Sequence, residues 1–264
     1  MPLAEQDGRS LTRLVEIMQR LLAPNGCPWD REQTLQSLRP YVIEEAHEVV
    51  DAIDGGSPSE LREELGDLLL QVVFQAELAR AQGWFGPDDV VQAICDKLVR
   101  RHPHVFGEVT VRDSNEVLAN WEVIKAEEKR GRGVLEGVPA ALPALLRALR
   151  VGEKAARVGF DWPDAAGARA KLDEELGELD QALAEGDRDA AERELGDVLF
   201  ALVSVARKAD LDPEAALRGT LARFAQRVRR VESRVANAGQ TLAAQTPEQL
   251  DRLWNEAKAD EAGT

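Results

Sequence analysis

The chain has 264 residues, of which 44% are hydrophobic and 5% aromatic. This composition supplies enough apolar surface for a folded core and argues against global disorder. With 33 basic and 48 acidic residues, the formal net charge is −15. We therefore expect no direct binding to nucleic acid and no attraction to anionic membranes.

Cysteine usage and hydropathy give a first expectation about the compartment. Cys27 and Cys95 lack the Cys-x-x-Cys spacing of a zinc or redox site. Residues 1–7 lack the basic and apolar parts of a signal peptide. The longest apolar stretch, around 68–74, is far shorter than the ~20 residues that a membrane helix needs. We expect a cytoplasmic protein without a membrane segment.

Apolar residues repeat at spacings of three and four along the first half of the chain, which is typical of amphipathic helices. The pattern predicts helices at 11–22, 42–53, 61–76 and 90–98. The second half repeats this plan and ends on a helix that a capping box at 246–249 opens. Period-two alternation is absent, so the predicted fold class is all-α, with helical bundles.

An internal repeat is the strongest feature of the sequence. The string Glu-Glu-x-x-Glu at 44–48 recurs at 174–178, and Glu-Leu-Gly-Asp at 64–67 recurs at 194–197. Both strings recur after 130 positions, so two helices and the turn between them match without a gap. A repeat of this size indicates a duplicated module.

The boundary between the two copies has the composition of a linker. A charged, glycine-rich run at 129–133 is followed by Pro139. We predict an N-terminal domain at 1–130, a linker at 131–139 and a C-terminal domain at 140–264.

Counting residues from the turns places the acids at matching heights. Glu178 and Glu194 each lie 8 residues from Gly186, and Glu175 and Asp197 each lie 11 residues from it. In an antiparallel hairpin, equal counts mean equal height, so Glu178 should face Glu194 and Glu175 should face Asp197. Around Gly56 the first copy repeats these counts with its own acids, Glu45, Glu48, Glu64 and Asp67.

Four carboxylates in this arrangement repel one another unless a cation lies among them. Ligands that offer only oxygen suit Mg²⁺, with Mn²⁺ as the alternative. A single acidic run would be read as a solvated helix face, but two hairpins with one register favour metal binding. We predict a metal site in the second copy and a second acidic site, which Glu44 joins, in the first. The glycine between the acids, Gly196, predicts close helix packing there.

A di-iron centre is the rival interpretation of the acids. It requires Glu-x-x-His on each of two helices. Glu44-x-x-His47 fits once, but Gly177 stands at the matching position of the second copy. We therefore set this interpretation aside.

Cations and aromatic rings suited to a triphosphate accompany the acids of the second copy. Arginine binds phosphate oxygens in a bidentate manner, and an indole ring stacks on a base. The alternative is that these residues are surface charges and core packing. The candidates are Lys171, Arg223, Arg227, Trp254 and Lys258. In the first copy, Lys97 echoes Arg223, but Tyr41 stands where the second copy has Lys171.

The repeated acidic strings resemble the signature of the MazG family, and the resemblance covers nearly the whole chain. The segments at 25–30, 100–106, 158–162 and 194–200 are also similar to the two-domain form of that family. One departure is that the family's Asn-x-Lys-Phe-x-x-Arg appears at 221–227 with Leu in place of Asn and Arg in place of Lys.

The resemblance implies an intertwined, all-α homodimer that hydrolyses nucleoside triphosphates to nucleoside monophosphate and pyrophosphate. It attributes hydrolysis to the C-terminal half and nucleotide contacts to Lys171, Arg223, Arg227 and Trp254. The implied Mg²⁺ ligands are Glu175, Glu178, Glu194 and Asp197.

We therefore expect a Mg²⁺-dependent enzyme that acts broadly on the nucleotide pool. Among the acids at the site, Glu174, Glu175 and Glu178 are the catalytic candidates, with Glu174 or Glu175 accepting the proton of the attacking water. Two alternatives stay open. One is a nucleotide sensor or scaffold without turnover, a role that the first copy alone could also have. The other is a narrow dUTP or dCTP hydrolase with the same metal site.

Overall fold

A computed structural model describes residues 10–128, 131 and 133–262. Within these residues the chain forms α-helices and one short 3-10 helix, and no strand. The predicted all-α fold is confirmed. The predicted domain ends and linker, and the expectation about residues 1–7, extend over positions that lie outside the described part. No described helix is both long and apolar enough to cross a membrane.

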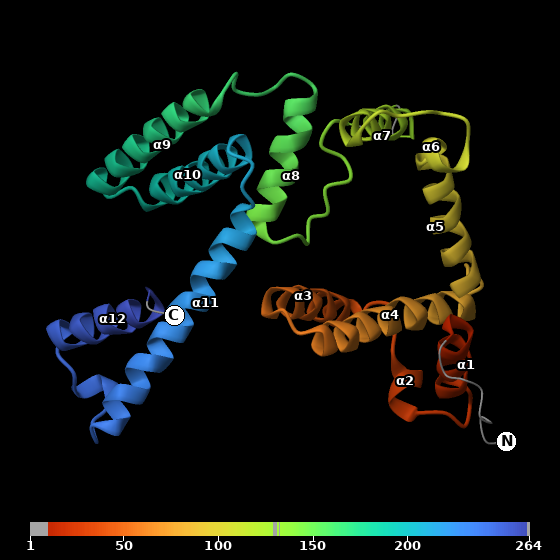
Figure 1. Ribbon diagram of the computed structural model, residues 1–264, viewed down its shortest axis with the longest axis horizontal. Helices are drawn as coiled ribbons and strands as arrows, with labels where there is room; N and C mark the ends of the chain where they lie inside the picture. The colour runs from red at the N-terminus through yellow and green to blue at the C-terminus, as the bar shows by residue number, and fades with distance from the viewer. Residues whose placement is uncertain (1–9, 129–130, 132, 263–264) are drawn as a thin grey trace. The chain divides into compact units, whose positions relative to one another are not determined.

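The chain divides into two compact units, residues 1–129 and 130–264 (Figure 1). The helices of the N-terminal unit are α1 (Leu11–Leu22), α2 (Pro28–Glu32), α3 (Arg39–Gly55), α4 (Pro58–Ala81), α5 (Pro87–Arg101), α6 (Pro103–Phe106) and α7 (Ser114–Glu128). The elements of the C-terminal unit are α8 (Ala144–Arg157), α9 (Ala165–Glu185), α10 (Arg188–Lys208), α11 (Pro213–Asn237), η1 (Leu242–Ala244) and α12 (Pro247–Ala262).

Each unit contains one antiparallel hairpin of long helices, α3–α4 in the first and α9–α10 in the second. Within each hairpin the two helices lie side by side (Figure 1). The turns are set by Gly56 and Gly186, whose φ angles of 70° and 72° lie in the left-handed region that glycine adopts without steric strain. The following helices begin at N-caps Ser57 and Asp187, whose side chains accept hydrogen bonds from backbone N–H groups. Glycine stops and polar starts therefore fix the register of both hairpins.

Small apolar clusters hold the helices together. In the N-terminal unit, Met18 of α1 packs with Val73 and Phe74 of α4, and Leu38, which precedes α3, joins the same buried cluster. In the C-terminal unit, Leu172 of α9 packs against Val198 and Ala201 of α10. In the C-terminal unit, Leu172 lies one helical turn before Glu175 and Val198 directly follows Asp197, so packing of this core helps to fix where these carboxylates stand.

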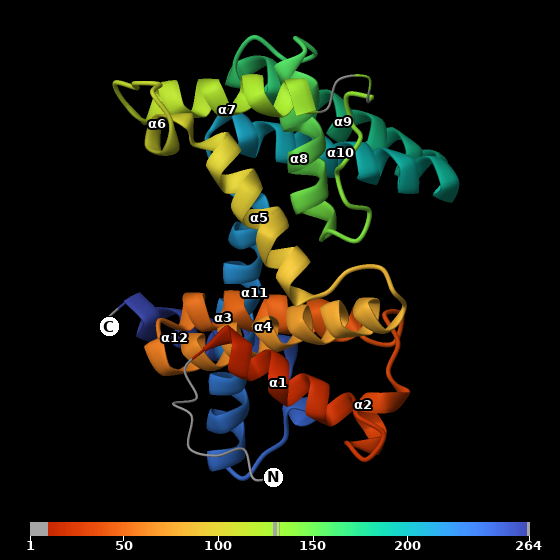
Figure 2. The same cartoon turned by 90° about the vertical axis from the view of Figure 1, so that its right-hand side faces the viewer.

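The long helix α11 connects two parts of the C-terminal unit. Its C-terminal half packs on α12 through Val231, Val235 and Ala257, whereas it also contacts α8 and α10. Figures 1 and 2 show α12 and the α9–α10 hairpin at opposite ends of α11. This separation decides which of the predicted site residues meet.

Candidate functional site

Three carboxylates of the α9–α10 hairpin form a close cluster. Glu175, Glu194 and Asp197 each offer an oxygen, and these oxygens all lie within 4.8 Å of one another. Glu175 is 7% exposed, Glu194 is half-buried and Asp197 is exposed. Hard oxygen ligands at this spacing fit Mg²⁺, which takes one to a few carboxylates and completes its shell with water and phosphate.

Glu178, the fourth predicted ligand, stands beside this cluster. Burial and then the neighbouring charge of Glu175 raise the pKa of Glu178 above its usual value, and Glu194 adds to the effect. The interaction with Glu194 agrees with the register counted from Gly186. The carboxylates are thus held together against their mutual repulsion.

The N-terminal unit repeats the cluster on α3–α4 with Glu45, Glu64 and Asp67, whose oxygens also lie within 4.8 Å of one another. Burial, followed by the charges of Asp67 and Glu48, raises the pKa of Glu45. Burial, followed by the charges of Glu48 and Asp67, raises the pKa of Glu64. Glu44 is exposed on α3.

The glycine between the acids does not mark a close helix contact, and that prediction was wrong. A Cβ atom added to Gly196 would meet nothing within 4 Å, and the same holds for Gly66 in the first copy. Two positions after Glu194, a residue has turned about 200° around the helix and points away from the partner helix.

Lys171 belongs to the acidic cluster of the C-terminal unit. Its Nζ atom lies 2.7 Å from Oε1 of Glu174 and 2.8 Å from Oε1 of Glu175. The hydrogen bonds to Glu174 and Glu175 raise the pKa of Lys171 well above its usual value. Tyr41, at the matching position of the N-terminal unit, instead packs edge-on against Trp29 with ring centroids 6.1 Å apart.

The other predicted nucleotide-binding residues gather on α11 and α12. Arg227 donates two hydrogen bonds to Glu261 Oε2, at 2.7 and 3.0 Å. Its guanidinium lies 5.4 Å from the ring centroid of Trp254, and Phe224 packs on the same ring at 5.1 Å. Trp254 and Phe224 also line an apolar cavity of about 440 Å³.

Arg223 and Lys258 are exposed members of this second group. Arg223 donates a hydrogen bond to Thr220. The structure therefore brings the acids and Lys171 together, and separately brings Arg227 and Trp254 together. Among the described residues, no hydrogen bond or ion pair joins the two groups. The acids stand on the α9–α10 hairpin, whereas Arg223 and Arg227 stand in the middle of α11.

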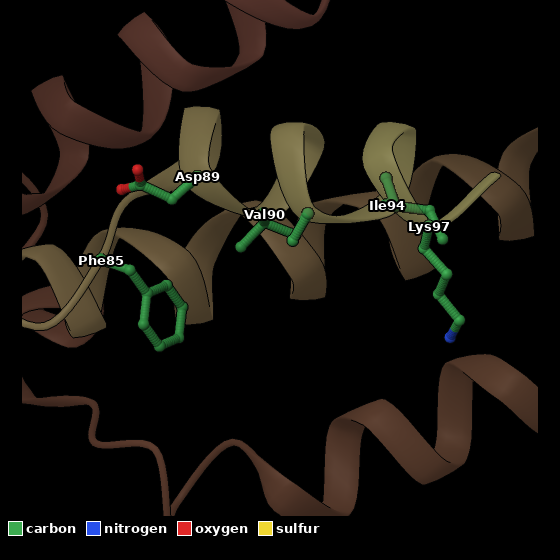
Figure 3. A pocket seen from close by; sticks show the side chains of 6 residues that line it. Phe85, Asp89, Val90, Ile94 and Lys97 are labelled. Atoms are coloured by element: carbon green, nitrogen blue, oxygen red, sulfur yellow. The ribbon is translucent and has the colours of Figure 1, made fainter. Parts of the chain in front are cut away.

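Lys97, the echo of Arg223 in the N-terminal unit, lies at the rim of an open groove of about 550 Å³ along α5. Figure 3 shows Phe85, Val90 and Lys97 pointing to one side of the helix, into this groove. The groove is largely apolar, with Ile94 also contributing. Its lining leaves one face of α5 available for a further molecule.

Sequence reasoning missed one residue of the N-terminal cluster, Gln71. It is 7% exposed and its amide hydrogen-bonds to Glu45. Its side-chain oxygen is buried and accepts no hydrogen bond from the described residues. The sequence did carry a signal, because the position 130 residues later is Ala201: the two copies differ at a site-lining position.

A second missed feature is the anchor of the segment before α9. Asp161 accepts hydrogen bonds from Arg207 and, at 2.7 Å, from Lys208. Lys208 also donates to the carbonyl oxygen of Trp162 at 2.5 Å. These bonds fasten the Asp161–Trp162 segment to the end of α10 and so fix the start of α9, which carries Lys171 and Glu175.

Comparison with known proteins agrees with this geometry. The family model of the MazG nucleotide pyrophosphohydrolase domain matches twice, at residues 33–106 and 166–232. Each match covers one acidic hairpin. The chain belongs to the MazG family.

Several relatives match this chain over both copies. The nucleoside triphosphate pyrophosphohydrolase/pyrophosphatase MazG of Thermotoga maritima is 42% identical over 256 residues, covering 96% of this chain and 98% of that protein. The nucleoside triphosphate pyrophosphohydrolase of Escherichia coli K12 is 44% identical over 257 residues, covering 95% and 98%. That of Mycolicibacterium smegmatis is 35% identical and covers 93% of this chain and 66% of that protein.

The Asp161 anchor predicts a pH-dependent contribution to stability. Asp161→Asn should lower the free energy of unfolding at pH 7 by about 2 kcal/mol, because charge-assisted hydrogen bonds are lost. Arg207, and then Lys208, hold the pKa of Asp161 below its usual 3.8. The stabilisation is therefore complete above about pH 4 and is lost as the pH falls through the folded-state pKa.

Denaturant unfolding of both proteins between about pH 3 and pH 7 checks this. The difference between wild type and variant should narrow as the pH falls below about 4, and a difference independent of pH would contradict the assignment. Asp173→Asn is the control, because Asp173 makes an exposed ion pair with Arg169 on one helix face. It should change the free energy by less than about 0.5 kcal/mol.

Proposed function

We propose that this protein hydrolyses nucleoside triphosphates to nucleoside monophosphate and pyrophosphate, and that the C-terminal unit carries out the reaction with Mg²⁺. The observation that carries the proposal is the cluster of Glu175, Glu194 and Asp197 with Lys171 beside it. Membership of the MazG family supports it, since the relatives above are named for this activity.

In this mechanism the acids of the hairpin, with Glu178 beside them, would hold Mg²⁺. When bound, Mg²⁺ neutralises phosphate oxygens and polarises the attacking water. Glu174 or Glu175 accepts the proton of that water. The water oxygen bonds to phosphorus, and the bond that breaks lies in the bridge between the α- and β-phosphates, which releases pyrophosphate.

Cationic side chains stabilise the charge that builds up on the leaving pyrophosphate. Lys171 is poised at the acids and exchanges a carboxylate partner for a phosphate oxygen. Arg223, Arg227 and Lys258 supply further positive charge, and Trp254 offers a ring for the base. Stacking accepts every base, which supports a broad range of substrates and a housekeeping role in the nucleotide pool. Free cysteines and a nucleotide substrate support the proposal that the protein works in the cytoplasm.

We further propose that the active form is a homodimer. Among the described residues of one chain, no hydrogen bond or ion pair joins the acids of the α9–α10 hairpin to Arg227 of α11 or Trp254 of α12. A second copy would supply the missing set to each site. The apolar groove along α5 (Figure 3) and exposed residues such as Leu199 and Phe224 are surfaces that a symmetric partner would cover.

Identifying the products tests the reaction and its location together. With Mg²⁺ and each triphosphate, the wild type should release nucleoside monophosphate and pyrophosphate and no diphosphate. Glu175→Gln should reduce kcat about 100-fold or more, because the metal site is broken. Glu45→Gln removes the matching acid of the N-terminal unit. It should leave most of the activity, because that site has the neutral Tyr41 in place of the cationic Lys171.

Two outcomes would contradict the proposal. Orthophosphate and diphosphate as the first products would exclude the reaction. Equal losses in Glu175→Gln and Glu45→Gln, or a larger loss in Glu45→Gln, would show that turnover is not confined to the C-terminal unit. A thermal melt of each variant separates loss of the site from loss of the fold.

The dimer makes a separate prediction. Light scattering at micromolar concentration should give twice the mass of the 29.0 kDa chain. Mixing Glu175→Gln with Arg227→Ala should restore activity, because a mixed dimer can combine one intact acid set with one intact Arg227–Trp254 group. A monomeric mass would count against the dimer, and absence of restored activity would place both groups of one site on the same chain.

A further inference from the structure

The two acidic hairpins differ in how their charge is balanced. In the C-terminal unit, the Lys171 ammonium lies 2.8 Å from Glu175, inside the cluster. In the N-terminal unit, the matching residue is Tyr41, whose ring contacts Trp29 and brings no charge. Among the described residues, no cationic side chain forms an ion pair with Glu45, Glu64 or Asp67. The N-terminal acids therefore attract a free cation without a competing ammonium.

Gln71 adds a second, independent observation at the same place. The side chain is more than nine-tenths buried and its amide touches Glu45. Its oxygen is buried without a hydrogen-bond donor, which is an unfavourable state for an amide oxygen. Amide carbonyl oxygens are good ligands for hard divalent cations. A half-turn of the amide about its last bond directs this oxygen toward the acids.

At the matching position of the C-terminal unit stands Ala201, a member of the apolar core. The N-terminal unit thus has an additional oxygen where its copy has a methyl group, and a neutral ring where its copy has an ammonium. Both differences favour binding of a bare cation by the N-terminal unit.

We propose that the α3–α4 hairpin is a resident divalent-cation site, with Glu45, Glu64 and Asp67 as carboxylate ligands and Gln71 as an additional oxygen ligand. This site binds the cation in the absence of nucleotide, and more tightly than the α9–α10 hairpin does. There, Lys171 must first exchange its carboxylate partners for an anionic ligand. The proposal goes beyond the hydrolytic function and does not depend on which unit turns over nucleotide.

Titration of the nucleotide-free, full-length protein with Mn²⁺, followed by the paramagnetic resonance of free Mn²⁺, tests the proposal. Two classes of site are expected. Glu45→Gln should abolish the tighter class, and Glu175→Gln should abolish the weaker class. Gln71→Leu, which keeps the side-chain volume, should weaken the tighter class about tenfold, as loss of a supporting polar group does at metal sites.

Exchanging the residues that differ gives matched variants. Tyr41→Lys should weaken the tighter class, and Lys171→Tyr should strengthen the weaker class, each by about tenfold or more. Gln75→Leu is the control for Gln71→Leu, because Gln75 lies one helical turn further along α4 and lines the same cavity. It should leave both classes unchanged.

Thermal melts distinguish loss of metal binding from loss of the fold. Without metal, Glu45→Gln should melt at the same temperature as the wild type or higher, because it removes one charge from a repelling cluster. Mn²⁺ should raise the melting temperature of the wild type more than that of Glu45→Gln. A single class of sites, a tighter class that disappears in Glu175→Gln, or equal binding by Gln71→Leu and Gln75→Leu would each overturn the proposal.

Discussion

Repulsion among carboxylates that the backbone forces together is the interaction on which the rest of this structure depends. Left-handed glycines at Gly56 and Gly186 fix two helix hairpins in register, and the buried apolar faces prevent the helices from rotating apart. The acids then cannot separate. Burial and the neighbouring negative charges raise the pKa values of Glu45, Glu64 and Glu178 above the usual value. A fold that concentrates negative charge in this way is prepared for a cation and for the phosphates that accompany it.

Duplication gave the chain two copies of this hairpin, and the copies diverged in how they balance the charge. Lys171 neutralises part of the C-terminal cluster and is available to a phosphate. The N-terminal cluster has Tyr41 and Gln71 instead. An ammonium that can exchange a carboxylate for a phosphate suits the turnover that we propose for the C-terminal unit, whereas a neutral, buried amide suits the resident cation that we propose for the N-terminal unit. The same fold can therefore support turnover in one unit and constant occupancy in the other.

Much of this arrangement follows from the sequence, because helix periodicity and residue counts from a glycine turn are local properties. The helices, the hairpins and the pairing of acids across them could be predicted in this way. Gly196 stands between two acids in the sequence but makes no helix contact, because it lies on another face of the helix. The short helices α2 and α6 carry too few residues to show a period.

Other features depend on tertiary structure and left weaker signals. Gln71 is not titratable and belongs to no acidic string, so its contact with Glu45 appears only once the side chains are placed. The Asp161 anchor joins residues 46 positions apart, which no local pattern reveals. The separation of Arg227 and Trp254 from the acids depends on the length and direction of α11. The internal repeat assigns Arg227, Trp254 and the acids to the same module. It does not reveal that no hydrogen bond or ion pair joins these two groups within the described part of one chain.

The central claim is that the α9–α10 carboxylates form a divalent-cation site at which a triphosphate binds. Diffraction from crystals grown with Mn²⁺ and a non-hydrolysable nucleoside triphosphate tests it most directly, because anomalous scattering locates the ion without reference to activity. We expect a Mn²⁺ peak bounded by Glu175, Glu194 and Asp197, with phosphate oxygens completing its shell and Lys171 on the phosphate. Triphosphate bound elsewhere, with no ion among these three carboxylates, would contradict it.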